Sequence, residues 1–137
     1  MFDISKAQEA LAAEDEGIAV EIRDNSGEVA LCPDGSPVTI TVVGSYSKRC
    51  GDAREALQKR MAALKVRKPS RAQSEQHQAW FVADCVLDWH GITDDGKPFV
   101  FTRDNAIDLF LRLPFVREQV EAAMVDHAAF FSKRSTN

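Results

Sequence analysis

The chain has 137 residues, 45% of them hydrophobic and 28% charged, and carries a formal net charge of −4. This composition is typical of one globular domain with its own hydrophobic core, which excludes an intrinsically disordered chain. An acidic balance is also not that of a typical DNA-binding protein.

Residues 1–46 are predicted to form a helix followed by a small antiparallel β meander. The helix covers Asp3–Glu16, where Ser5 and Gln8 fit a capping box and Gly17 ends the helical pattern. Apolar and polar residues then alternate in three short stretches separated by turn residues, as in half-buried strands. These three expected strands lie at residues 18–23, 28–31 and 38–43. A meander of this size needs helices to cover its apolar face.

Residues 47–131 are predicted to be mainly helical. Four helices are expected, at residues 47–68, 70–88, 103–113 and 115–131. Thr102 is a suitable N-cap for the third helix, and Pro114 suits the start of the fourth. A tight turn at 94–96 precedes the third helix, and the polar residues 132–137 read as a flexible tail. The sequence therefore predicts a single α+β domain over residues 1–137.

Charge is distributed unevenly along the chain. Residues 1–34 hold nine acidic and two basic residues, whereas residues 35–71 hold nine basic and two acidic ones. The bases are Lys48, Arg49, Arg54, Lys59, Arg60, Lys65, Arg67, Lys68 and Arg71. A nucleic-acid-binding helix has similar charge, but this segment lacks interleaved aromatic residues. A solvated helix face, or one that docks on an acidic surface, is the better interpretation.

No pattern of catalytic, metal-binding or cofactor-binding residues is recognisable. The turn at 94–96 lacks the remaining ligands of a calcium loop, and Cys85 with His90 has no second pair for zinc. Three cysteines without a CxxC pair indicate reduced thiols, and no Gly-rich phosphate loop occurs. Neither a signal peptide nor an apolar run long enough for a bilayer is visible. We expect a soluble intracellular protein that is not an enzyme and needs no cofactor.

The C-terminal half resembles the phage tail assembly chaperones of long-tailed phages and prophages. In that family a helix ends at a Trp-x-Gly corner, a short turn follows, and a capped helix, a proline and a final helix complete the pattern. The resemblance covers about residues 78–131. The matching residues here are Trp89, Gly91, Asp94, Gly96, Pro98, Thr102, Asn105, Pro114 and Phe130. Many members are mainly helical, and the predicted meander departs from them.

The resemblance implies a binding protein rather than an enzyme. Family members bind the apolar, helical tape-measure protein before the tail tube polymerises, and they help to recruit tail tube subunits. They act in the host cytoplasm and are usually absent from the finished virion. The last two helices would then offer an apolar groove to the partner. Its candidate residues are Leu109, Leu113, Val116, Val120, Met124 and Phe131.

Other interpretations remain open at this point. The chain could be a structural tail or head-completion protein, or a small nucleic-acid-binding protein that uses residues 48–71. An enzyme built around Cys85, Asp88 and His90 is the weakest alternative. The sequence does not distinguish core from groove on the apolar helix faces, and it leaves homo-oligomerisation open.

Overall fold

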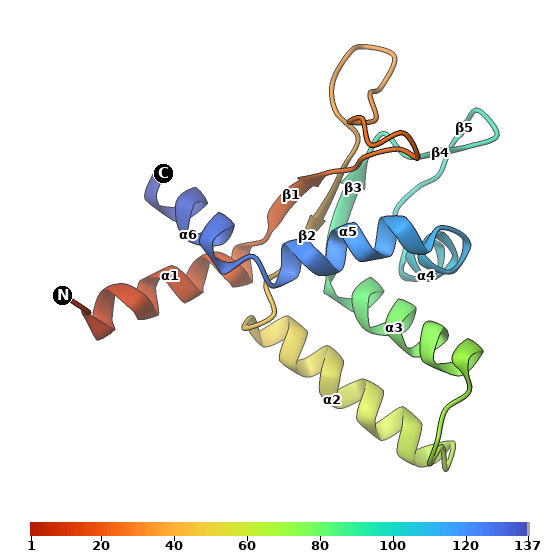
Figure 1. The fold of residues 1–137 in the computed structure, drawn as a ribbon, viewed down its shortest axis with the longest axis horizontal. Coiled ribbons are helices and arrows are strands. Elements are labelled where there is room, and N and C mark those ends of the chain that lie inside the picture. Colours follow the sequence, from red (N-terminus) through yellow and green to blue (C-terminus); the bar gives the residue numbers. More distant parts are fainter. Residues whose placement is uncertain (137) are drawn as a thin grey trace.

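In the computed structural model, which describes residues 1–136, the chain forms six helices and a small antiparallel sheet (Figure 1). The helices are α1 (Ile4–Glu16), α2 (Lys48–Ala63), α3 (Arg71–Cys85), α4 (Arg103–Arg112), α5 (Pro114–Met124) and α6 (His127–Thr136). The strands are β1 (Ile18–Glu21), β2 (Thr39–Val42), β3 (Val86–His90), β4 (Thr93–Asp94) and β5 (Lys97–Pro98). The predicted α+β class, with an antiparallel sheet and a mainly helical C-terminal part, is confirmed.

The main sheet has the order β1-β2-β3, with both pairs antiparallel. The first and third predicted strands therefore pair with each other directly. The middle one forms only isolated bridges, at Val29 and Leu31. Between these bridges the Ala30 N–H donates to the Ile22 carbonyl, and the Ala30 carbonyl accepts from the Val38 N–H, both at 2.8 Å. Residues 28–31 thus close the open end of the β1–β2 hairpin instead of adding a full strand.

The third strand of the sheet, β3, comes from a segment predicted to be helical. Helix α3 ends at Cys85, and Val86–His90 pairs with β2, with a register shift between Thr41 and Val42. A short apolar run fits a buried helix and a buried strand equally well, so periodicity alone could not separate them. The edge of β2 on which the middle meander strand was expected is taken by β1, and this distant segment pairs with the opposite edge of β2.

Helix boundaries follow local capping chemistry. Helix α1 is capped by Asp3, whose carboxylate accepts from the N–H groups of Ser5 and Lys6, so the predicted Ser5 cap is wrong. Thr102 accepts from the Asn105 N–H at 3.0 Å and caps α4, as predicted. Pro114 is the first residue of α5, where its missing N–H costs nothing.

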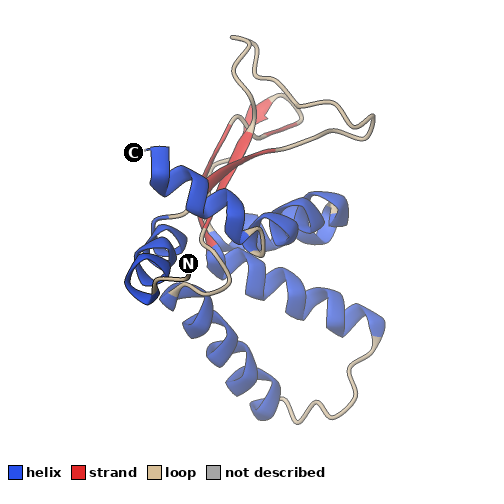
Figure 2. Ribbon diagram, turned by 60° about the vertical axis from the view of Figure 1, so that its left-hand side comes forward, coloured by secondary structure: helices blue, strands red, loops and turns tan. Residues whose placement is uncertain are grey.

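The last predicted helix is in fact two. Helix α5 ends at Met124, and α6 begins at His127 after a break in which Asp126 accepts from the Ala129 N–H at 3.2 Å. This break turns α6 onto α1, so that the two helices pack side by side (Figures 1 and 2). The predicted flexible tail, residues 132–137, is helical as far as Thr136, and Asn137 lies outside the described residues.

The main core lies between the sheet and helices α3, α4 and α5. Ile40 and Val42 on β2 are completely buried, as are Phe110 on α4 and Val120 on α5. Each such side chain contributes about 1.5–3 kcal/mol by leaving water. Helix α2 packs on the far side of α3, and together they project from the body as a helical hairpin (Figure 1). Within residues 1–136, no helix combines the length and apolar character needed to cross a membrane.

Candidate partner-binding surface

Helices α1 and α6 form an arm beside the main body (Figure 2). Only Ala13 and Glu14 are buried on α1, and Phe130 is the fully buried aromatic residue of α6. Ala13 and Phe130 do not join the main core cluster. The arm is therefore held by a small packing cluster of its own, and most of its apolar surface remains uncovered.

The joint between arm and body is built around the carboxylate of Glu14, which is only 2% exposed. One carboxylate oxygen accepts from the Tyr46 N–H at 3.0 Å, and the other lies 2.9 Å from His127 Nδ1. The Tyr46 ring stacks on the His127 ring with centroids 4.3 Å apart. These contacts satisfy a buried polar group that would otherwise be costly, and they fix α1 against the start of α6.

Gly44 makes this close approach possible. Its N–H donates to the Glu14 main-chain carbonyl at 2.9 Å. A Cβ at position 44 would lie 2.6 Å from Glu14 Cβ, which is closer than such atoms can approach. A side chain at this position would push α1 away from the body. Glycine is required here for space.

A groove of about 540 Å³ opens along the arm. Its walls combine small residues with large apolar side chains that reach into solvent: Phe2 is 83% exposed and Phe131 53% exposed. The lining residues are Met1, Phe2, Asp3, Lys6, Ala7, Ala10, Leu11, Glu14, Tyr46, His127, Ala128 and Phe131. Alanines between large apolar rims suit a groove that receives the apolar face of a helix.

The structure separates the six residues predicted to form a partner groove. Leu109, Val116, Val120 and Met124 are buried in the main core, and Leu109 and Val116 also line the floor of a hollow at its surface. Leu113 is 40% exposed and lines this same hollow, next to Phe115. Phe131 alone of the six lines the groove on the arm.

The other large apolar residues that line this groove were missed by the sequence reasoning: Met1, Phe2, Leu11 and Tyr46. Phe2 precedes α1 and its Asp3 cap, and Leu11 lies near the middle of the helix. That pattern could have marked an apolar stripe, but nothing local brings it beside Phe131. The contact between α1 and α6 joins segments from opposite ends of the sequence.

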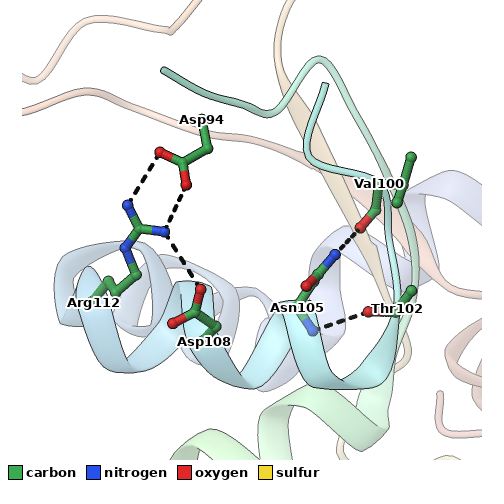
Figure 3. A network of polar contacts seen from close by, with 6 residues as sticks. All are labelled: Asp94, Val100, Thr102, Asn105, Asp108 and Arg112. Atoms are coloured by element: carbon green, nitrogen blue, oxygen red, sulfur yellow. Dashed lines mark hydrogen bonds and ion pairs between the residues drawn. The ribbon is translucent and has the colours of Figure 1, made fainter. Parts of the chain in front are cut away.

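The Trp89–Phe115 region forms a scaffold rather than a reactive loop. Asp95 and Gly96, both with positive φ, make the two-residue turn between β4 and β5. Arg112 on α4 holds this hairpin through both Asp94 carboxylate oxygens, at 3.0 and 3.2 Å, and also contacts Asp108 at 3.4 Å (Figure 3). The hydrogen bonds from Arg112 lower the pKa of Asp94, and Asp94 in turn raises the pKa of Arg112.

Two further contacts fix the segment that leads into α4. The Asn105 side-chain amide donates to the Val100 carbonyl at 2.8 Å, next to the Thr102 cap (Figure 3). The Trp89 indole N–H donates to the Phe99 carbonyl at 2.7 Å. The Asn105 amide and the Trp89 indole are therefore engaged in contacts that hold the fold.

The residues considered for chemistry do not gather into a site. Cys85 and Cys50 are buried, and burial together with the neighbouring Cys50 raises the pKa of the Cys85 thiol. A thiol in this setting is a poor nucleophile because the reactive form is the thiolate. His90 is exposed, with Ser36 Oγ 3.4 Å from its Nε2. Within residues 1–136 no group of three His, Cys, Asp or Glu side chains could hold a metal ion.

The structure is that of a small α+β protein with an exposed apolar groove between α1 and α6. A family model described as YdaY prophage protein matches residues 43–136 of the chain. The chain therefore belongs to this family of prophage proteins. Neither the curated proteins nor the solved structures gave a match.

Proposed function

We propose that the chain is a tail assembly chaperone of a phage or prophage. In this role it binds the tape-measure protein and helps to recruit tail tube subunits during tail morphogenesis. Two findings support the proposal. The chain belongs to a prophage family through residues 43–136, and residues 78–131 resemble the tail assembly chaperones. The protein would act in the host cytoplasm without catalysis and would be absent from the mature virion.

The observation that carries the proposal is the apolar groove between α1 and α6. A tape-measure protein presents long helices with apolar stripes, and such a stripe needs a temporary apolar cover until the tail tube encloses it. Helix-in-groove recognition supplies that cover through a few large anchors such as Phe2, Leu11 and Phe131. Because these residues are already exposed, partner release does not disturb the main core.

Substitutions in the groove test the proposal more specifically than a binding assay with the unaltered chain alone. The chain is co-expressed with the tape-measure protein of the same prophage, and the partner's soluble fraction and its retention on the tagged chain are measured. The double variant Leu11→Asp, Phe131→Asp should weaken retention at least about tenfold, because large apolar anchors dominate such interfaces. The matched control Val100→Asp, Leu111→Asp places the same charges on exposed apolar residues outside the groove and should retain the partner.

Two results would count against the proposal. If the partner stays insoluble and is not retained by the unaltered chain, the chain is not its chaperone. If the chain is a stoichiometric part of finished virions, the structural tail or head-completion function takes its place.

A further inference from the structure

The helical hairpin of α2 and α3 ends in a basic tip, defined here as residues 59–71. The tip comprises the end of α2, the connecting loop and the first residue of α3. It has no acidic residue; the nearest ones in sequence are Glu55 and Glu75. Its six basic residues are Lys59, Arg60, Lys65, Arg67, Lys68 and Arg71.

Most of this positive charge is unpaired. Arg71 lies 3.6 Å from Glu75, and the Arg60 guanidinium lies 3.9 Å from the centre of the Trp80 ring. The other four basic side chains form no hydrogen bond or ion pair with the described part of the chain. Leu64, at the end of α2, is 59% exposed among them. An apolar side chain within a cationic surface favours an acidic protein surface over a bare phosphate backbone.

An acidic surface with matching apolar residues exists on the same chain. Glu9, Asp15 and Glu16 of α1 are exposed acidic residues that do not line the groove. On α1, Ile4 is exposed, and Gln8 and Glu9 are exposed as well. None of these three residues lines the groove between α1 and α6. This outer face of α1 is therefore available while the groove holds a partner.

The tip cannot reach α1 of its own molecule. The end of α1 approaches the start of α2 at Lys48, whose N–H donates to the Asp15 carboxylate at 2.8 Å. From that junction α1 and α2 run apart (Figure 1). The 16 residues of α2 place the end of the helix, beside Leu64, about 24 Å away from the junction. Opposite charges within one molecule are thus held apart.

We propose that the basic tip of one copy docks on the outer face of α1 of a second copy. The interface joins two unlike surfaces, with Leu64 against apolar α1 residues such as Ile4 and the lysines against Glu9 and its acidic neighbours. Two such contacts made reciprocally close a dimer, whereas contacts that do not reciprocate continue into a chain or ring. The pairing of unlike surfaces is common to both arrangements, and it does not rest on the identity of the partner in the groove.

The association should be detectable with the purified full chain by sedimentation velocity. At about 50 mM NaCl we expect association that depends on protein concentration, and at about 500 mM NaCl we expect dissociation, because salt screens exposed charges. The variant Lys59→Glu, Lys68→Glu reverses the tip, and Gln8→Lys, Glu9→Lys reverses the outer face of α1. Each should weaken association at least about tenfold while the circular dichroism spectrum stays unchanged.

Mixing the two variants is the decisive measurement. The acidic α1 of the tip variant meets the basic tip of the α1 variant, so the mixture should associate although each variant alone does not. The control Arg23→Glu, Lys97→Glu makes the same change in net charge at exposed bases elsewhere and should associate like the unaltered chain. A chain that is monomeric at low salt, a mixture that stays monomeric, or a control as weak as the tip variant would each overturn the proposal.

Discussion

The main body buries its large apolar side chains, whereas the α1–α6 arm leaves several of its own exposed. In the body the large side chains, such as Phe110 and Ile40, are fully buried between sheet and helices. In the arm Phe2, Leu11 and Phe131 face solvent, and a polar joint at Glu14 supplies the attachment. Under the proposed function, stability and binding are therefore assigned to different parts of one small domain. A binding surface outside the core can change its partner without changing the fold.

The largest expected effect is a difference in unfolding free energy between substitutions at a core phenylalanine and at an exposed one. Phe110→Ala should lower the free energy of unfolding by about 3–5 kcal/mol, because it leaves a cavity in the packed core. Phe131→Ala, on the exposed side of α6, should change it by less than about 0.5 kcal/mol. Urea unfolding measures both values. Equal losses would show that the arm is as much a part of the core as the body is.

The next effect concerns the joint. Gly44→Ala introduces a methyl group against Glu14 and should cost about 1–3 kcal/mol by forcing a backbone shift. Limited proteolysis should then cleave within α1 earlier, while amide protection in β2 and α4 is retained. Gly51→Ala is the control, because a Cβ at that helical position meets no atom within 4 Å. If Gly44→Ala loosens arm and body together, the two are one cooperative unit.

A smaller and local effect is expected at the β4–β5 hairpin. Arg112→Ala removes the two contacts to Asp94 and should speed amide exchange in the hairpin without shifting the thermal midpoint of the body. Exposed ion pairs of this kind contribute little to global stability. Lys97→Ala, at an exposed base in the same hairpin, should leave the exchange rates unchanged.

The smallest effect is the acid response of the same contact. Because the hydrogen bonds from Arg112 lower the pKa of Asp94 below the ordinary aspartate value of 3.8, the contact is fully present above that pH. It is lost as the pH falls through the lower pKa of the folded state. Hairpin amide exchange followed by NMR below pH 4 should rise in the unaltered chain relative to the body. In the Arg112→Ala variant, hairpin exchange should not rise in this way. A rise of equal size in that variant would show that the Arg112–Asp94 contact is not its cause.

Local signals predicted well the parts of the fold that depend on neighbouring residues. The Thr102 cap, the Pro114 helix start and the 94–96 turn are each set by the chemistry of a few adjacent residues. The α+β class followed from the change between alternating and helical periods. The Ser5 cap was wrong because Asp3, two residues earlier, is an equally good acceptor and lies at the actual helix start.

The sequence-based predictions were wrong where contacts between distant segments decide the structure. Residues 86–90 join the sheet because β2 offers them an unpaired edge, which no local pattern encodes. The break at Val125–Asp126 contains no glycine or proline, so the run of helix-forming residues concealed it. The same break also determines where the predicted site residues lie. It leaves Val120 and Met124 in the core and carries Phe131 to α1, and the predicted groove becomes two unrelated surfaces.

The side-by-side packing of α1 and α6 has a consequence for biosynthesis. One wall of the groove is translated long before the other, with most of the chain made in between. A nascent chain emerging from the ribosome at about 5–20 residues per second can fold its sheet and inner helices while the groove still lacks a wall. The groove therefore first exists only when α6 emerges and docks on α1, so an unfinished molecule cannot capture a partner there.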